Sequence, residues 1–317
     1  MARQKRRSRR TAVRLIAAGT IALAAGAAAL SALPAAAAAA HGDRPAGFWY
    51  GTDSRTVSIT GSAPYKEPVI GGSYGGYIGM TGNWANLENC HKILVWSAAN
   101  AAQANADKAR GVGVGTGVYF FMGGPGVDPH YNGTTAEASA WGAVEAGRAL
   151  ADAAKLKITY PVIWADIEIP GDAPNYTPAP DNGWNSVYTS PCSGVVRISS
   201  VPASVDRAVF NGFANYVTAH SKYKVGVYSA PDIWASIFGT GSAASIPNTY
   251  EWTYESFTGS LSHHPDGWCL SGTSTCARFF GGVTSGSKYA LMWQWSGGGG
   301  SDNGVGDFDQ IDANRTP

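Results

Sequence analysis

Apolar positions along the chain follow two periods, one typical of strands and one typical of helices. Short apolar runs, each predicted to be a strand, lie at residues 75–80, 93–96, 115–122, 158–169 and 224–229. Ala-rich stretches with helical spacing, each predicted to be a helix, lie at residues 98–110, 134–155 and 205–221. Two further strands are predicted at residues 250–257 and 289–295, with no helix after them. Strands that alternate with helices predict parallel strands connected by crossovers.

Residues typical of helix ends support the helix boundaries. The first helix stops at Gly111, and Thr134 or Thr135 can cap the second, which has Glu137 in its first turn. Near the start, the segment Trp49–Ser54 could end a first strand with the acid Asp53, although a turn aspartate is the alternative.

The first forty residues have the layout of a secretory signal peptide. A basic stretch at residues 1–14 precedes an apolar stretch at 15–33 and a run of alanines before His41. We expect cleavage between about Ala36 and Gly42 and a mature protein that is secreted or associated with the cell wall. Ser8-Arg9-Arg10 resembles a twin-arginine signal, and the Sec route remains the alternative. An uncleaved N-terminal anchor is the competing interpretation.

The rest of the chain is acidic. Seven of the 23 Lys and Arg residues lie in residues 1–40, so that 16 cations face 22 acids beyond them. An acidic body excludes a general nucleic-acid binder. No apolar run long enough to span a membrane follows residue 40. We expect residues 41–317 to form one monomeric domain, with an insertion at 170–202 that is rich in Pro, Asn, Gly and Ser.

Four cysteines fit an oxidising compartment. Cys269 and Cys276 are close in a Gly/Ser-rich segment and are expected to pair, which would leave Cys90 with Cys192. Four cysteines allow three pairings, and the sequence does not choose among them. No CxxC motif occurs, so neither a metal nor another cofactor is expected.

The strongest candidate chemistry is the acid pair Asp166 and Glu168 at the end of the most apolar strand. Period-two geometry places both carboxylates on one face, with Cα atoms about 6.6 Å apart. Burial of two acids side by side costs free energy and favours a protonated acid beside a carboxylate. That combination is typical of glycoside hydrolysis. The alternative is that both acids cap loops or bind Ca²⁺ at a strand end.

A second cluster lies near the C-terminus. Trp293 and Trp295 share one face of a predicted strand, and Asp309 follows in an acidic segment. An aromatic pair beside carboxylates suits stacking on sugar rings. The alternative is that the tryptophans fill a core, which is the more common place for any one tryptophan.

These motifs together resemble glycoside hydrolase family 25, the lysozyme or muramidase family. Asp53 resembles the acid that ends the first strand of the family, and the segment 117–121 resembles its third strand, with Phe120 in place of a histidine. Asp166-Ile167-Glu168 resembles its Asp-x-Glu motif. Residues 225–229 resemble its Gly-Ile-Tyr-Thr strand, and 293–296 with Phe308-Asp309 resemble its ending. Related secreted barrels of the glycoside-hydrolase type are equally similar.

The resemblance implies a single TIM-like α/β barrel of irregular type, poor in helices after its last strands. It implies hydrolysis of β-1,4 bonds in cell-wall peptidoglycan, with Glu168 as general acid and Asp166 beside it. Asp53 and Asp309 would position the water or the sugar. The residues expected to line the cleft are Tyr119, Tyr228, Trp252, Trp293 and Trp295. The alternatives are an inactive glycan-binding barrel and a hydrolase of a different glycan.

Overall fold

The computed structural model describes residues 48–54, 77–78, 98–109, 115, 117–169, 181–189, 195–239, 249–254, 291–296 and 307–312, all within the unit Ala38–Pro317. The predicted signal peptide, the four cysteines and the predicted strand 93–96 lie outside these residues.

Eight strands pair in a closed order, β1-β2-β3-β4-β7-β8-β9-β10 and back to β1. Their bounds are Phe48–Ser54 (β1), Tyr77–Ile78 (β2), Gly117–Phe121 (β3), Val162–Asp166 (β4), Lys224–Ser229 (β7), Thr249–Tyr254 (β8), Met292–Ser296 (β9) and Asp307–Asp312 (β10). Neighbours are parallel from β1 to β9, whereas β10 is antiparallel to both β9 and β1. The predicted α/β class is therefore confirmed as a curled, mostly parallel sheet, and the antiparallel β10 departs from a regular TIM barrel.

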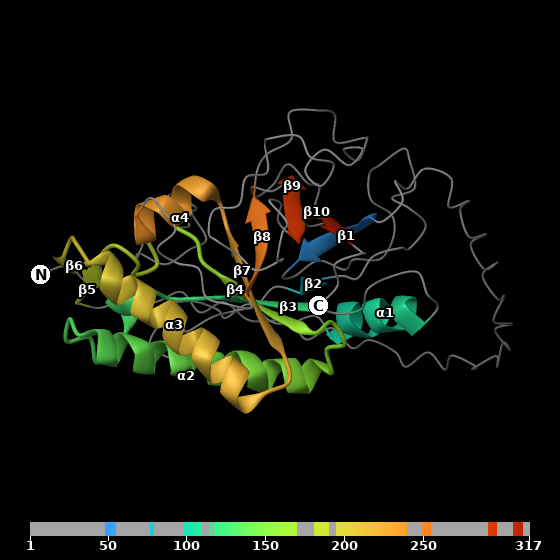
Figure 1. Cartoon of the computed structure of the whole chain (residues 1–317), viewed down its shortest axis with the longest axis horizontal. Helices are drawn as coiled ribbons and strands as arrows, with labels where there is room; N and C mark the ends of the chain where they lie inside the picture. The colour runs from blue at the N-terminus through green and yellow to red at the C-terminus, as the bar shows by residue number, and fades with distance from the viewer. Residues whose placement is uncertain are drawn as a thin grey trace, which may run out of the picture. The chain divides into compact units, whose positions relative to one another are not determined.

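Four α-helices are present in the part of the chain that the structure describes (Figure 1). Their bounds are Ala98–Ala109 (α1), Thr135–Leu156 (α2), Ala203–His220 (α3) and Pro231–Phe238 (α4), and a short 3₁₀ helix, η4, spans Pro125–Val127. The structure selects Thr134 as the cap of α2, because its hydroxyl accepts the Glu137 amide at 3.2 Å. The last turn of α2 ends at Lys157, which adopts a left-handed conformation with φ 54°.

The two faces of β4 are buried in different layers, as the period-two pattern predicts. Ile163, Ala165 and Ile167 belong to the core that includes the apolar residues of α2 and α3. Trp164 alternates with them and belongs to a second apolar cluster, which also holds Trp252 and Met292. We call this second group the interior cluster; its other members are Tyr160, Val162, Tyr228 and Leu291.

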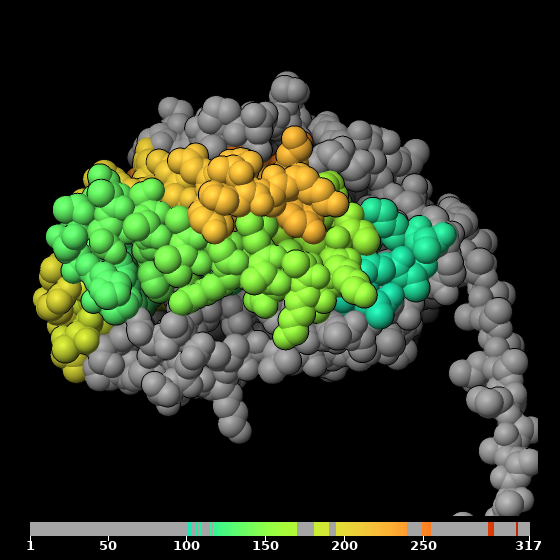
Figure 2. All heavy atoms as spheres, turned by 90° about the horizontal axis from the view of Figure 1, so that it is seen from below, coloured from blue at the N-terminus to red at the C-terminus, as the bar shows by residue number. Residues whose placement is uncertain are grey.

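Helices α2 and α3 pack at close range through two glycines. A Cβ built on Gly142 of α2 would lie 1.9 Å from the carbonyl oxygen of Val209, and one on Gly212 of α3 would lie 2.0 Å from that of Ser139. Figure 2 looks onto the helical side of the molecule, where the green residues of α2 lie at the surface. This contact fixes both helices against the outer side of β4.

The described part of the predicted insertion is ordered by main-chain contacts. The strands β5 (Val187–Tyr188) and β6 (Val196–Ile198) form an antiparallel pair. The Gly124 amide donates to the Asn182 carbonyl at 3.0 Å, and the Gly126 amide donates to the Gly183 carbonyl at 2.8 Å. The segment 181–188 therefore packs against the turn that follows β3.

Among the described residues, no helix has the length and apolar character needed to cross a membrane.

Two glycines on α2 allow a matched test of the helix packing. Gly142→Ala should lower the free energy of unfolding by at least about 2 kcal/mol, because the added methyl group meets main chain of α3. Gly147→Ala should instead raise it by about 0.5–1 kcal/mol, since its nearest neighbour is the Tyr216 hydroxyl at 3.7 Å. Urea denaturation of both variants checks the pair, and equal effects of the two substitutions would contradict the close packing.

Candidate functional site

Strand register places several predicted site residues side by side. Asp166, the last residue of β4, pairs with Tyr228 of β7, and Tyr228 pairs with Trp252 of β8. On the other side, Tyr119 of β3 pairs with Trp164 of β4, two residues before Asp166. Because side chains alternate along each strand, these residues share the interior face of the sheet.

Trp252 is the centre of the aromatic contacts on this face. Its ring centroid lies 4.6 Å from that of Tyr228, 5.6 Å from that of Trp164 and 5.8 Å from that of Tyr119. Trp252 is 1% exposed, whereas Tyr119 is half-buried. Trp252 thus supports the site from within the interior cluster, and Tyr119 is the more accessible ring.

Polar side chains from the last strands extend the same face. The indole Nε1–H of Trp252 donates to Oδ1 of Asp309 at 2.9 Å, and Asp309 is fully buried. The Tyr228 hydroxyl donates to Oε1 of Gln294, which is also buried. These bonds connect β7 and β8 to β9 and β10 across the interior of the barrel.

The acid pair lies where β4 ends. Asp166 is 4% exposed, whereas Glu168, two residues beyond it, is half-buried. Between them, the Ile167 amide donates to the Tyr228 carbonyl at 2.9 Å, and the Ser229 hydroxyl donates to the Ile167 carbonyl at 2.8 Å. The chain therefore continues alongside β7 between Asp166 and Glu168.

The remaining predicted residues lie on other strands. Asp53 lies in β1, where its main chain pairs with Tyr77 of β2 and Asp307 of β10. Trp295 lies in β9. Trp293 is fully buried and alternates with Met292, an interior-cluster residue, so it lies on the opposite face from Trp252. The prediction that Trp293 lines the cleft is not supported, because both faces of β9 are covered.

Three residues with a part in this arrangement were not in the predicted set. Trp164 contacts Trp252, Gln294 accepts from Tyr228, and Glu145 of α2 reaches the turn after β3. Gln294 lies in the segment 293–296 that resembles the ending of the family, but its bond to Tyr228 has no signal in the sequence. Glu145 has no signal either, because one acid on an amphipathic helix is typical of a solvent-exposed face.

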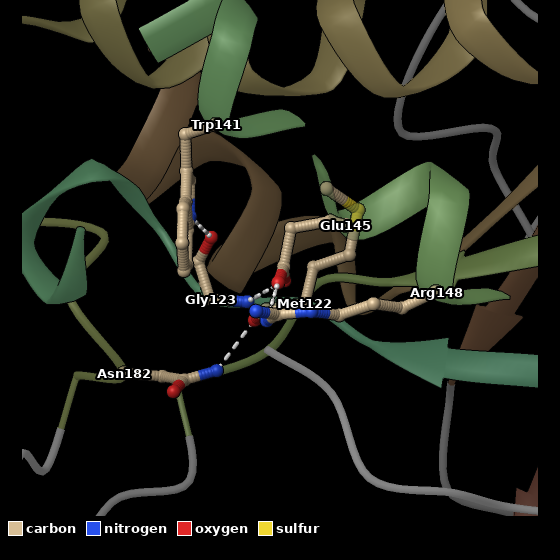
Figure 3. Close-up of polar contacts among 6 residues, drawn as sticks. All are labelled: Met122, Gly123, Trp141, Glu145, Arg148 and Asn182. Atoms are coloured by element: carbon tan, nitrogen blue, oxygen red, sulfur yellow. Dashed lines mark hydrogen bonds and ion pairs between the residues drawn. The ribbon is translucent and has the colours of Figure 1, made fainter. Parts of the chain in front are cut away.

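The turn after β3 is held by side chains from α2 (Figure 3). Oε2 of Glu145 accepts the Gly123 amide at 3.0 Å, and the indole of Trp141 donates to the Gly123 carbonyl at 3.0 Å. Burial raises the pKa of the Glu145 carboxyl to about 8, against the opposing effects of the Gly123 amide and Arg148. Arg148 Nη1 lies 3.3 Å from the other carboxyl oxygen.

A second buried acid, Asp206, lies in the first turn of α3. It is fully buried, and neither carboxyl oxygen has a hydrogen-bond partner among the residues that the structure describes. Burial, and then the charge of Asp181, raises the pKa of Asp206 to about 9. Asp181 itself accepts from the Gly183 amide at 2.9 Å and from the Tyr188 hydroxyl at 2.8 Å.

Within the described ranges, no group of three or more His, Cys, Asp or Glu side chains could hold a metal ion.

Comparison with solved structures finds matches over most of the chain. A muramidase from Acremonium alcalophilum matches with 16% identity and a TM-score of 0.44, covering 84% of this chain and 96% of that one. A family GH25 lysozyme from Aspergillus fumigatus matches with 14% identity and a TM-score of 0.42, covering 83% and 93%. A bacterial lysozyme from Streptomyces coelicolor matches with 16% identity and a TM-score of 0.40, covering 84% and 94%.

No family model and no curated protein sequence matches the chain.

The buried Asp206 predicts a pH dependence of stability. Its pKa is raised in the fold above the ordinary 3.8 to about 9, so the folded state retains a proton that the unfolded state loses. The contribution of this protonated carboxyl to the free energy of unfolding is fully present below about pH 4. It is lost as the pH rises toward 9. Asp206→Asn should remove this slope, and its free energy of unfolding should exceed that of the wild type most clearly near pH 9. Urea denaturation at pH 5, 7 and 9 measures it.

Asp232→Asn is the matched control, because Asp232 is also a first-turn acid but is exposed. An Asp206→Asn variant with the same pH slope as the wild type would show that Asp206 is ionised in the fold.

Proposed function

We propose that the protein is a secreted glycoside hydrolase that cleaves β-1,4 bonds in a cell-wall glycan such as peptidoglycan. The observation that carries the proposal is the position of Asp166 at the end of β4, on the face that also presents Tyr228 and Trp252, with Glu168 two residues beyond it. A pair of carboxyl groups is what glycosidic cleavage most often uses, and neighbouring aromatic rings can pack against sugar rings. The resemblance of the sequence motifs to glycoside hydrolase family 25 supports the same reaction.

Glu168 is the proposed general acid. It lies beyond the end of β4 and is half-buried, so a leaving-group oxygen can approach it, whereas Asp166 is 4% exposed. The negative charge of Asp166 nearby favours retention of a proton on Glu168. Once Glu168 has given that proton to the glycosidic oxygen, Asp166 stabilises the oxocarbenium-like state by its charge.

Asp309 and Asp53 are proposed to position the water or the sugar from the far side of the site. Asp309 lies in β10 next to β1, because Gly51 pairs with Asp309, and Asp53 follows two residues later. The Trp252 indole fixes Oδ1 of Asp309. Tyr119, the half-buried ring on β3, is the proposed contact for a sugar face, since C–H faces of sugars pack on aromatic rings.

The proposed location outside the cell rests on residues 1–40. Their basic, apolar and Ala-rich order predicts that export removes them. N-terminal sequencing of the protein from culture fluid or from the wall fraction should therefore give a first residue between about Ala36 and Gly42. Recovery of the intact Met1 terminus from that material would contradict cleavage.

The substitution Glu168→Gln tests the reaction. It keeps the side-chain shape but removes the transferable proton, so release of sugar fragments from insoluble peptidoglycan should fall by at least about 10²-fold. Mass spectrometry of the released fragments identifies the bond that is cut. Asp152→Asn on α2 is the matched acid-to-amide control, and it should retain full activity.

A wild-type protein that binds the glycan but releases no new reducing ends would favour the alternative of an inactive glycan-binding barrel. Activity that survives Glu168→Gln would show that another residue donates the proton.

A further inference from the structure

The turn after β3 contacts the acid pair through the main chain. The amide of Met122, the first residue beyond β3, donates to the carbonyl of Asp166 at 2.9 Å. Asp166 is the last residue of β4, so this bond joins the turn to the end of the strand that carries Asp166. A shift of the turn would therefore move the main chain that carries Asp166 and, two residues later, Glu168.

Buried side chains of α2 hold the next residue of this turn. Gly123 donates its amide to Glu145 and accepts from the Trp141 indole, each at 3.0 Å (Figure 3). Both side chains are buried: Trp141 is 6% exposed and Glu145 is fully buried. Both the amide and the carbonyl of Gly123 are therefore hydrogen-bonded to side chains of α2.

The predicted insertion holds the same turn from its other side. The side-chain amide of Asn182 donates to the Met122 carbonyl, and the Asn182 carbonyl accepts from the Gly124 amide at 3.0 Å. Asn182 is fully buried and has a left-handed φ of 52°. Met122, Gly123 and Gly124 are therefore fixed between α2 and the insertion.

We propose that Glu145 is a positioning residue for the acid pair: by holding the Gly123 amide, it sets the turn from which Met122 binds the main chain of Asp166. This inference rests on the proposed function, because it assigns Glu145 a part in the turnover that Asp166 and Glu168 carry out.

A carboxyl group suits this place better than an amide in either protonation state, because both of its oxygens can accept a hydrogen bond and an amide NH₂ group cannot. Both groups that contact Glu145 are donors, the Gly123 amide at one oxygen and the Arg148 guanidinium at the other. Glutamine has one carbonyl oxygen, so its NH₂ group would face one of these donors. The charges that act on Glu145 are Arg148, which favours ionisation, and Asp128, which opposes it. Burial of an ionised carboxylate costs free energy, and an apolar side chain at position 145 would avoid that cost. It would, however, leave the Gly123 amide without an acceptor.

The test compares Glu145→Gln and Trp141→Phe with Asp152→Asn, a half-buried acid on the same helix. If Glu145 positions the acid pair, Glu145→Gln should lower kcat on peptidoglycan by about 10-fold to 100-fold and leave KM within about twofold. Trp141→Phe, which loses the bond to the Gly123 carbonyl, should lower kcat in the same way. Asp152→Asn should leave both constants unchanged. An unchanged kcat in Glu145→Gln would overturn the proposal.

Amide hydrogen exchange provides a readout that does not depend on activity. In Glu145→Gln, the amides of Gly123 and Met122 should exchange at least about tenfold faster than in Asp152→Asn, while core amides of α3 keep their protection. Unchanged protection at Met122 would overturn the inference. A wild type that releases no sugar fragments would overturn the proposed function, and the exchange data would still decide whether Glu145 controls the turn next to Asp166. If Glu145→Gln does not fold, the exchange rates and kcat of Trp141→Phe are compared with those of Asp152→Asn instead.

Discussion

The alternation of side chains along β4 is the constraint on which the rest of the arrangement depends. Ile163, Ala165 and Ile167 face the helices, and this requirement leaves Trp164 and Asp166 no position except the interior face. A carboxylate at the end of a strand that is buried on both faces has few ways to meet solvent or substrate. It can reach them only at the end of the strand, and Asp166 is the last residue of β4, with Glu168 two residues beyond it.

Much of the α/β framework could be predicted from the sequence because its signals are local. The strand β7 has the predicted bounds Lys224–Ser229, since apolar residues alternate there between a helix and Pro231. The start of α2 was predicted because a threonine cap and a first-turn glutamate occur together. The short helix α4 was missed because eight residues show barely two helical periods. The strand β10 was not predicted because three of its six residues are aspartates, which hides the apolar pattern of a strand.

The site could be predicted only in part, and the reason is physical. A period of two assigns residues to two faces but does not say which face is interior, and in β9 both faces are buried. The sequence predicts that the face of β9 with Trp293 and Trp295 lines the cleft. The structure instead places Met292 and Gln294 on the interior side. The role of Glu145 depends on contact between residues 22 positions apart in sequence, and such a contact leaves no local pattern.

The packing of the segment 181–188 on the turn after β3 has a consequence for how the site can change during evolution. The two are joined mainly by main-chain bonds and by glycines that leave no room for a Cβ: one built on Gly126 would lie 1.7 Å from the Ser186 carbonyl oxygen, and one on Gly183 would lie 2.6 Å from the Val127 nitrogen. Main-chain bonds do not depend on side-chain identity. The half-buried side chain of Asn185 is therefore less constrained by this contact than the glycines and Asn182. Substitutions at such positions can change the surface of this segment without rebuilding the barrel that supports it.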